Sequence, residues 1–205
     1  MKRNYIPLIP PIAKSPFDMT PEEAGLYFKW FVNHVDERAE YVREKAANGL
    51  GIPISVFDFT IKSMQPLWKW FLSVMEVVKS APITSHAVSK KQAFLDLIAQ
   101  GCGKELSVFS IYVLRDIAMY IGKVFVRYEA INWIYRTKPK RYVFINSPLL
   151  AGFIDTQYEP PFHAEFDPVQ ITMALAQKSF KKKQNEDDPY NLLKRWEDTV
   201  PISHG

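Results

Sequence analysis

Residues 104–128 limit the folds open to this chain more than any other segment. As a helix, the segment has apolar side chains around most of its circumference and only a narrow polar stripe. The stripe consists of Arg115, Asp116, Gly122, Lys123 and Arg127. A helix that is apolar on nearly all sides is normally buried, so we predict that this one is central and that the other helices pack around it.

Two earlier segments share a pattern that is typical of a helix start. Residues 15–31 read SPFDMTPEEAGLYFKWF and residues 55–71 read SVFDFTIKSMQPLWKWF, with Ser, Phe, Asp, Thr, Lys, Trp and Phe at the same places in both. A threonine hydroxyl can accept a hydrogen bond from a free N–H of the first helical turn, so we predict N-caps at Thr20 and Thr60. Trp30 and Trp70 then follow about three turns along each helix, where we expect both to be mostly buried against the central helix.

The remaining elements are predicted from prolines, glycines and changes of hydrophobic pattern. We expect helices over residues 21–47 with a bend near 33–36, 61–79 with Ser63 as an alternative cap, 90–99, 168–182 and 189–199 with Asp188 as cap. Residues 131–138, 141–146 and 149–154 are rich in aromatic and β-branched residues, which indicates two or three antiparallel strands. The expected fold is α+β and mostly α: a helical bundle around a central apolar helix, with a small antiparallel β-hairpin or three-stranded sheet before the C-terminal helices.

The length and composition favour one domain. The chain has 205 residues, of which 47% are hydrophobic. We divide it into an extended proline-rich arm (1–19), a helical part (20–130), a β-hairpin part (131–155), and a proline-rich loop with C-terminal helices (156–205). The one cysteine, Cys102, cannot form an internal disulfide, and no apolar run reaches the roughly 18 residues of a membrane span. We therefore expect a cytoplasmic protein without a membrane partner.

No familiar catalytic or cofactor motif occurs. The sequence lacks GxGxxG, Walker, HExxH, GxSxG and CxxC patterns. The histidines are widely spaced and no helical pair of them is suggested, so we expect no metal site and no cofactor. Asp18 and Asp58 recur in the two similar segments, and we interpret them as residues that form loop hydrogen bonds. These absences favour a protein that is not an enzyme, with no catalytic residue assigned.

Two groups of residues are candidate sites. The predicted hairpin interleaves aromatic rings with cations, as protein-binding and single-stranded nucleic-acid-binding surfaces do. Its candidate residues are Trp133, Tyr135, Arg136, Lys138, Arg141 and Tyr142. The alternative is an edge hairpin that its lysines protect against aggregation. The second group is Arg115, Asp116 and His163, where buried charges either pair with other helices or line the edge of a pocket.

Several segments together resemble a family of uncharacterised bacterial proteins, mainly from Gram-positive species. The shared features are the two WF helix entries, the Arg115-Asp116 pair, the TKP turn at 137–139 and the PPFH loop at 160–163. The resemblance spans nearly the whole chain and implies one cytoplasmic domain, with no known activity and no catalytic residue. Lys29 and Lys69 stand where relatives often have an acidic residue before WF.

Three functional hypotheses follow. The first is a non-catalytic protein that binds an unknown protein partner, with an immunity-type role, in which it neutralises a toxin, as one form. The alternative is nucleic-acid binding through the basic aromatic hairpin and the lysine run at residues 181–183, consistent with a net charge of +4. The third is an enzyme with an unidentified substrate and a pocket near Arg115, Asp116 and His163.

Overall fold

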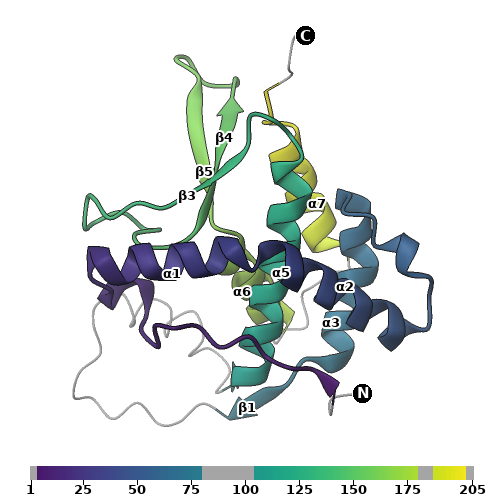
Figure 1. Cartoon of the computed structure of the whole chain (residues 1–205). Helices are drawn as coiled ribbons and strands as arrows, with labels where there is room; N and C mark the ends of the chain where they lie inside the picture. Colours follow the sequence, from purple (N-terminus) through teal and green to yellow (C-terminus); the bar gives the residue numbers. More distant parts are fainter. Residues whose placement is uncertain (1–3, 80–103, 180–186, 202–205) are drawn as a thin grey trace.

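The computed structural model describes residues 4–79, 104–179 and 187–201 (Figure 1). Its helices are α1 (Pro21–Asn33), α2 (Val35–Leu50), α3 (Met64–Val74), α5 (Val108–Val126), α6 (Pro168–Ser179) and α7 (Asp188–Glu197). Its strands are β1 (Val77–Lys79), β2 (Lys104–Leu106), β3 (Asn132–Ile134), β4 (Leu149–Asp155) and β5 (Phe162–Phe166). The predicted α+β, mostly α fold is confirmed. The helix predicted over 90–99, Cys102 and the lysine run at 181–183 lie outside the described residues.

Helix α5 is the central element (Figure 1), as its apolar circumference predicts. Helices α2 and α6 make its most extensive contacts. The predicted start at residue 104 is wrong. Residues 104–106 form β2, which pairs with β1 in a two-stranded antiparallel sheet. Ser107 then caps α5, because its side chain accepts a hydrogen bond from the Ser110 N–H.

The first of the two similar segments starts a helix as predicted. The Thr20 side chain accepts the Glu23 N–H, and the Glu23 carboxylate accepts the Thr20 N–H, which together form a capping box. The predicted bend is a break at His34, where α1 ends and α2 begins. Helix α2 continues to Leu50 and ends at Gly51, whose φ of 66° is a left-handed conformation that glycine adopts readily.

The second segment does not follow the prediction. The Thr60 side chain donates to Asp58 Oδ1 instead of capping a helix, and residues Ile61–Ser63 form a single 3₁₀ turn. Helix α3 begins only at Met64, and the alternative cap Ser63 makes no cap hydrogen bond either. The helix also ends at Val74 rather than residue 79, because Val77–Lys79 pairs as β1. The two segments are therefore similar in sequence but differ in local structure: one begins an α-helix directly, and the other begins with a 3₁₀ turn.

Strands β3, β4 and β5 form an antiparallel sheet in the order β3-β4-β5. The strand predicted over residues 141–146 is wrong: those residues form turns, and Asn146 has a φ of 62° while its Nδ2 donates to the carbonyls of Pro16 and Met19. The third strand is instead β5, within the segment expected to be a proline-rich loop. Gly152, with φ of 112°, lies at the irregularity between β4 and β5, where a Cβ would overlap the Ala130 carbonyl.

The two tryptophans of the similar segments differ in burial. Trp70 is only 4% exposed and belongs to the main core, as predicted. Trp30 is partly buried and packs against the smaller core cluster, so it is less enclosed than Trp70. Its ring lies beside Tyr27, with centroids 5.6 Å apart, and the Arg115 guanidinium covers it from 5.6 Å. Trp30 therefore has both apolar contacts with its core cluster and a cation–π contact from α5.

No helix within residues 4–79, 104–179 and 187–201 is long and apolar enough to cross a membrane.

Candidate functional site

The Arg115-Asp116 pair of α5 has two separate environments. Asp116 is 1% exposed and accepts hydrogen bonds from Arg38 of α2, from Nε at 3.1 Å and Nη2 at 2.5 Å. The Tyr5 hydroxyl of the N-terminal arm also donates to Asp116. Arg115 instead donates to the Leu8 carbonyl at 3.3 Å. Both residues thus bind the arm and neighbouring elements, which is the structural alternative raised by the sequence.

Burial and charge shift the ionisation of this cluster. Burial raises the pKa of Asp116, and the Arg38 guanidinium opposes that rise only in part. Burial lowers the pKa of Arg38, but the hydrogen bond and charge of Asp116 outweigh this effect, and the net pKa is raised. Burial and the neighbouring Asp116 raise the pKa of Tyr5 well above its usual value. Arg38 therefore remains a cation that needs its buried carboxylate.

His163 is not part of this cluster. It lies exposed on β5, opposite Ile154 of β4, and no hydrogen bond or ion pair in the described part of the chain joins it to Arg115 or Asp116. Among the described residues, no three His, Cys, Asp or Glu side chains gather closely enough to hold a metal ion.

The aromatic residues of the candidate hairpin pack against the protein. The Trp133 ring lies over Gly122 of α5, where a Cβ would overlap it, and meets Phe31 edge to face at 5.2 Å. Tyr135 stacks on Phe28 of α1, with ring centroids 4.7 Å apart. These contacts use ring surface that a base-stacking site would need.

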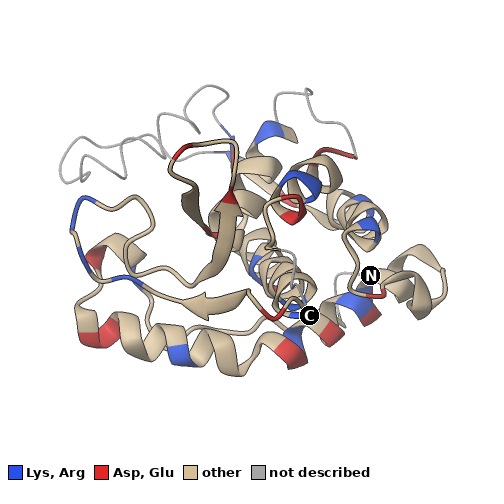
Figure 2. Cartoon of the chain, turned by 90° about the horizontal axis from the view of Figure 1, so that it is seen from above, with Lys and Arg blue, Asp and Glu red and all other residues tan. Residues whose placement is uncertain are grey.

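The polar groups of this hairpin divide into a paired set and an exposed set. Arg136 forms an ion pair with Glu165 of β5 at 2.5 Å, and the Tyr142 hydroxyl donates to the same carboxylate. Burial raises the pKa of Glu165, but these two hydrogen bonds outweigh it and lower the net pKa. Lys138 and Arg141 are exposed. Figure 2 shows Lys and Arg interspersed with Asp and Glu around the molecule rather than gathered on one side.

We expect these exposed cations, rather than the hairpin rings, to contribute to any binding of oligo(dT). Replacing Lys138 and Arg141 with Ser should lower the slope of log affinity against log salt by up to about 1.4, since each single-strand phosphate contact contributes about 0.7. The Tyr135→Leu variant should leave the affinity unchanged. Fluorescence anisotropy at several salt concentrations measures both effects. Binding that resists salt and depends on Tyr135 would contradict this prediction and support a nucleic-acid-binding surface.

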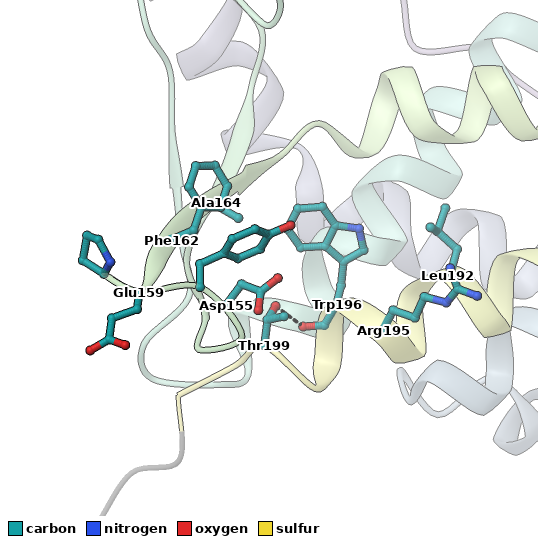
Figure 3. A pocket seen from close by; sticks show the side chains of 10 residues that line it. Asp155, Glu159, Phe162, Ala164, Leu192, Arg195, Trp196 and Thr199 are labelled. Atoms are coloured by element: carbon teal, nitrogen blue, oxygen red, sulfur yellow. Dashed lines mark hydrogen bonds between the residues drawn. The ribbon is translucent and has the colours of Figure 1, made fainter.

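A second surface, absent from the predicted sites, is an apolar cleft between the β4–β5 turn and α7, which we call the aromatic cleft (Figure 3). Its volume is about 660 Å³. Its lining residues are Asp155, Tyr158, Glu159, Pro160, Phe162, Ala164, Leu192, Arg195, Trp196 and Thr199. Clefts of this size and apolar character are typical of ligand and peptide sites.

The alternation of β5 and the docking of α7 build this cleft. Phe162 and Ala164 are two residues apart on the strand and therefore point to the same face, where both line the cleft. Trp196 of α7 packs against Phe153 and Phe166, with centroids 4.9 and 4.8 Å away. The Ile154 N–H also donates to the Thr199 carbonyl, which ties the end of α7 to β4. The wall formed by Trp196 is therefore fixed.

The opposite wall of the aromatic cleft exposes two large rings. Phe162 is 58% exposed and Tyr158 is 61% exposed, and their centroids are 6.2 Å apart. Adjacent exposed aromatic residues over a cleft are more informative than scattered ones, because they mark a surface that other molecules can cover. The sequence offered only one hint of this site, since the PPFH segment that includes Phe162 was among the features of the resemblance.

A more polar cleft of about 700 Å³ lies where Ile61–Ser63 approaches α7. Its charged groups are largely engaged inside the protein: Asp58 accepts the Thr60 N–H and hydroxyl, and Glu197 pairs with Lys194 at 2.7 Å. Its walls lack the exposed rings of the aromatic cleft, so we regard the aromatic cleft as the better candidate site.

Asp167, which precedes α6, should make the stability of the protein depend on pH. Its Oδ1 accepts the N–H groups of Val169 and Gln170, both at 2.9 Å, and its burial raises the pKa to about 6. The folded state therefore holds a proton that the unfolded chain releases near pH 4, so this residue's contribution to stability falls as pH rises from about 4 to about 6. Between pH 4 and pH 6 the free energy of unfolding of the wild type should therefore fall by about 2–3 kcal/mol relative to that of the Asp167→Asn variant.

Urea unfolding of both proteins at several pH values measures this difference. The Asn variant keeps the Oδ1 acceptor and removes the ionisation, which makes it a matched control. If the free energies of unfolding of the two proteins change with pH in the same way, Asp167 does not bind its proton in this range.

Comparison with protein-family models, curated proteins and solved structures finds no match for this chain.

Proposed function

We propose that this protein is a non-catalytic binding protein whose interface is the aromatic cleft. The observation that carries the proposal is the pair of exposed rings, Tyr158 and Phe162, facing Trp196 across a cleft of about 660 Å³. Aromatic anchors that fill such pockets contribute most of the binding energy in many protein interfaces.

The Asp116 cluster and the predicted hairpin are weaker candidates for the interface than the aromatic cleft. Asp116 is bound by Arg38 and Tyr5, and the hairpin rings Trp133 and Tyr135 pack against α5 and α1. Their polar and aromatic groups are thus already used within the fold. The aromatic cleft has solvent-exposed rings without a comparable covering segment in the described part of the chain.

The narrower form of the proposal is an immunity-type role in a bacterial cytoplasm. In that form the partner is a toxin, and the protein neutralises it by covering a functional surface. A toxin encoded beside this gene should then bind the cleft, and co-expression should restore growth of cells that produce the toxin.

Selection from a phage library of random 12-residue peptides tests the proposal. The wild-type protein should enrich related peptides, and the same library screened against Phe162→Ala should not enrich them. Because Phe162 is 58% exposed, this change should leave the fold intact, which thermal unfolding checks. If no peptide is enriched, or the same peptides are enriched on both proteins, the cleft is not a peptide-binding interface.

A further inference from the structure

The charges in the aromatic cleft indicate what kind of side chain it accepts. Asp155 lies within the lining, and Glu159 stands at its outer side in Figure 3. In the described part of the chain, Asp155 accepts only the Gln157 N–H, at 2.9 Å, and no cation forms an ion pair with Asp155 or Glu159. The cleft thus carries two carboxylates that lack a positive partner.

Aromatic rings next to these carboxylates add a second attraction for a cation. Tyr158, Phe162 and Trp196 line the same cleft as Asp155. The face of an aromatic ring attracts ammonium and guanidinium groups, and the attraction is largest where water is partly excluded. The alkyl stem of lysine or arginine can also pack against apolar walls while its charged end stays near a carboxylate.

Arg195 lines the cleft but does not neutralise these carboxylates. It extends along α7 beside Leu192, on the other side of Trp196 from Asp155 in Figure 3, and no carboxylate of the described residues forms an ion pair with it. The cleft therefore has an acidic, ring-lined end at the β4–β5 turn and a basic end on α7.

We propose that the acidic end of the aromatic cleft binds a lysine or arginine side chain of the partner polypeptide. This inference rests on the proposed function and names the residue type that the partner must present. The rings hold the aliphatic stem and the cation, Asp155 binds the charged end, and Glu159 adds to the local negative potential. Arg195 repels a second cation, and this repulsion restricts the basic side chain to the turn end of the cleft.

Two NMR titrations of the ¹⁵N-labelled protein test the inference directly. The probes are Nα-acetyl-lysine N-methylamide and its norleucine analogue, which keeps the aliphatic stem and lacks the charge. The lysine probe should shift the Trp196 indole and the amides of residues 155–159 and 162–164, and it should bind about tenfold more tightly than the norleucine probe. Equal affinities, or shifts elsewhere, would overturn the inference.

The double variant Asp155→Asn and Glu159→Gln is the matched control. The asparagine keeps the oxygen that accepts the Gln157 N–H, so the turn should remain intact, as unchanged thermal unfolding would show. This variant should bind the lysine probe about tenfold more weakly and the norleucine probe as before. A glutamate probe that binds the wild type more tightly than lysine would overturn the inference and assign the cleft to Arg195.

The peptide selection separates failure of this inference from failure of the proposed function. Enriched peptides that need Phe162 but share no Lys or Arg would overturn the inference and leave the proposed function standing. If no peptide is enriched while the lysine probe still binds, the proposed function fails, and the cation-binding end of the cleft is retained.

Discussion

Replacing Asp116 with Ala should lower the free energy of unfolding by about 3–5 kcal/mol. The carboxylate is 1% exposed and receives two hydrogen bonds from Arg38, whose own side chain is also buried. Removing it leaves a buried guanidinium without its counter-charge, and the cost of that uncompensated charge dominates the effect. Equilibrium denaturation by guanidinium chloride measures the loss.

A double variant separates this mechanism from simple loss of packing. Changing Arg38 to Met and Asp116 to Leu removes both charges and retains apolar volume, so it should be more stable than Asp116→Ala alone. If the free energy of unfolding of Asp116→Ala is within about 1 kcal/mol of the wild-type value, Arg38 must find another partner. The buried pair would then not be a determinant of stability.

Replacing Trp70 with Ala should lower the free energy of unfolding by about 3–5 kcal/mol, which is the second large effect that we expect. Trp70 is 4% exposed in the main core, where its ring lies against Gly49 of α2 and Tyr5 of the arm. Truncation removes its apolar contacts and leaves a cavity that a packed core closes only in part. The same denaturation measurement applies.

Trp30→Ala is the matched comparison for Trp70→Ala. Trp30 occupies the equivalent place in the first similar segment but is half-buried beneath Arg115. Replacing Trp30 should lower the free energy of unfolding by about 1–2 kcal/mol, because the ring is only partly buried and makes one cation–π contact. Equal costs for the two variants would show that the segments contribute equally to the core, contrary to their difference in burial.

The central helix could be predicted because its evidence lies within one segment. Apolar residues cover most of the helical circumference between Val108 and Val126, and only burial satisfies that pattern. The second similar segment shows the limit of such reasoning. Thr60 resembles Thr20 in sequence and both have an extended backbone, but the Thr60 hydroxyl donates to Asp58, whereas the Thr20 hydroxyl accepts the Glu23 N–H. Short-range hydrogen bonds of Thr and Asp compete with helix initiation.

The aromatic cleft could not be predicted because its walls come from separate segments. Phe162 and Trp196 have no sequence pattern that distinguishes them from core aromatics, and only the packing of α7 on the β4–β5 hairpin brings them to one cleft. At the predicted hairpin, the sequence did not show which rings pack against the helices. The Trp133 ring fills the space above Gly122, and Tyr135 stacks on Phe28 while it stays 37% exposed.

The affinity of a selected peptide for two variants of equal exposure tests the functional proposal most directly. Phe162 and Val143 are both 58% exposed, but only Phe162 lines the aromatic cleft, while Val143 lies in the turns after β3. Isothermal titration calorimetry should find that Phe162→Ala weakens binding about tenfold or more and that Val143→Ala leaves it unchanged. Unchanged binding by Phe162→Ala, or an equal loss in Val143→Ala, would contradict an interface at the aromatic cleft.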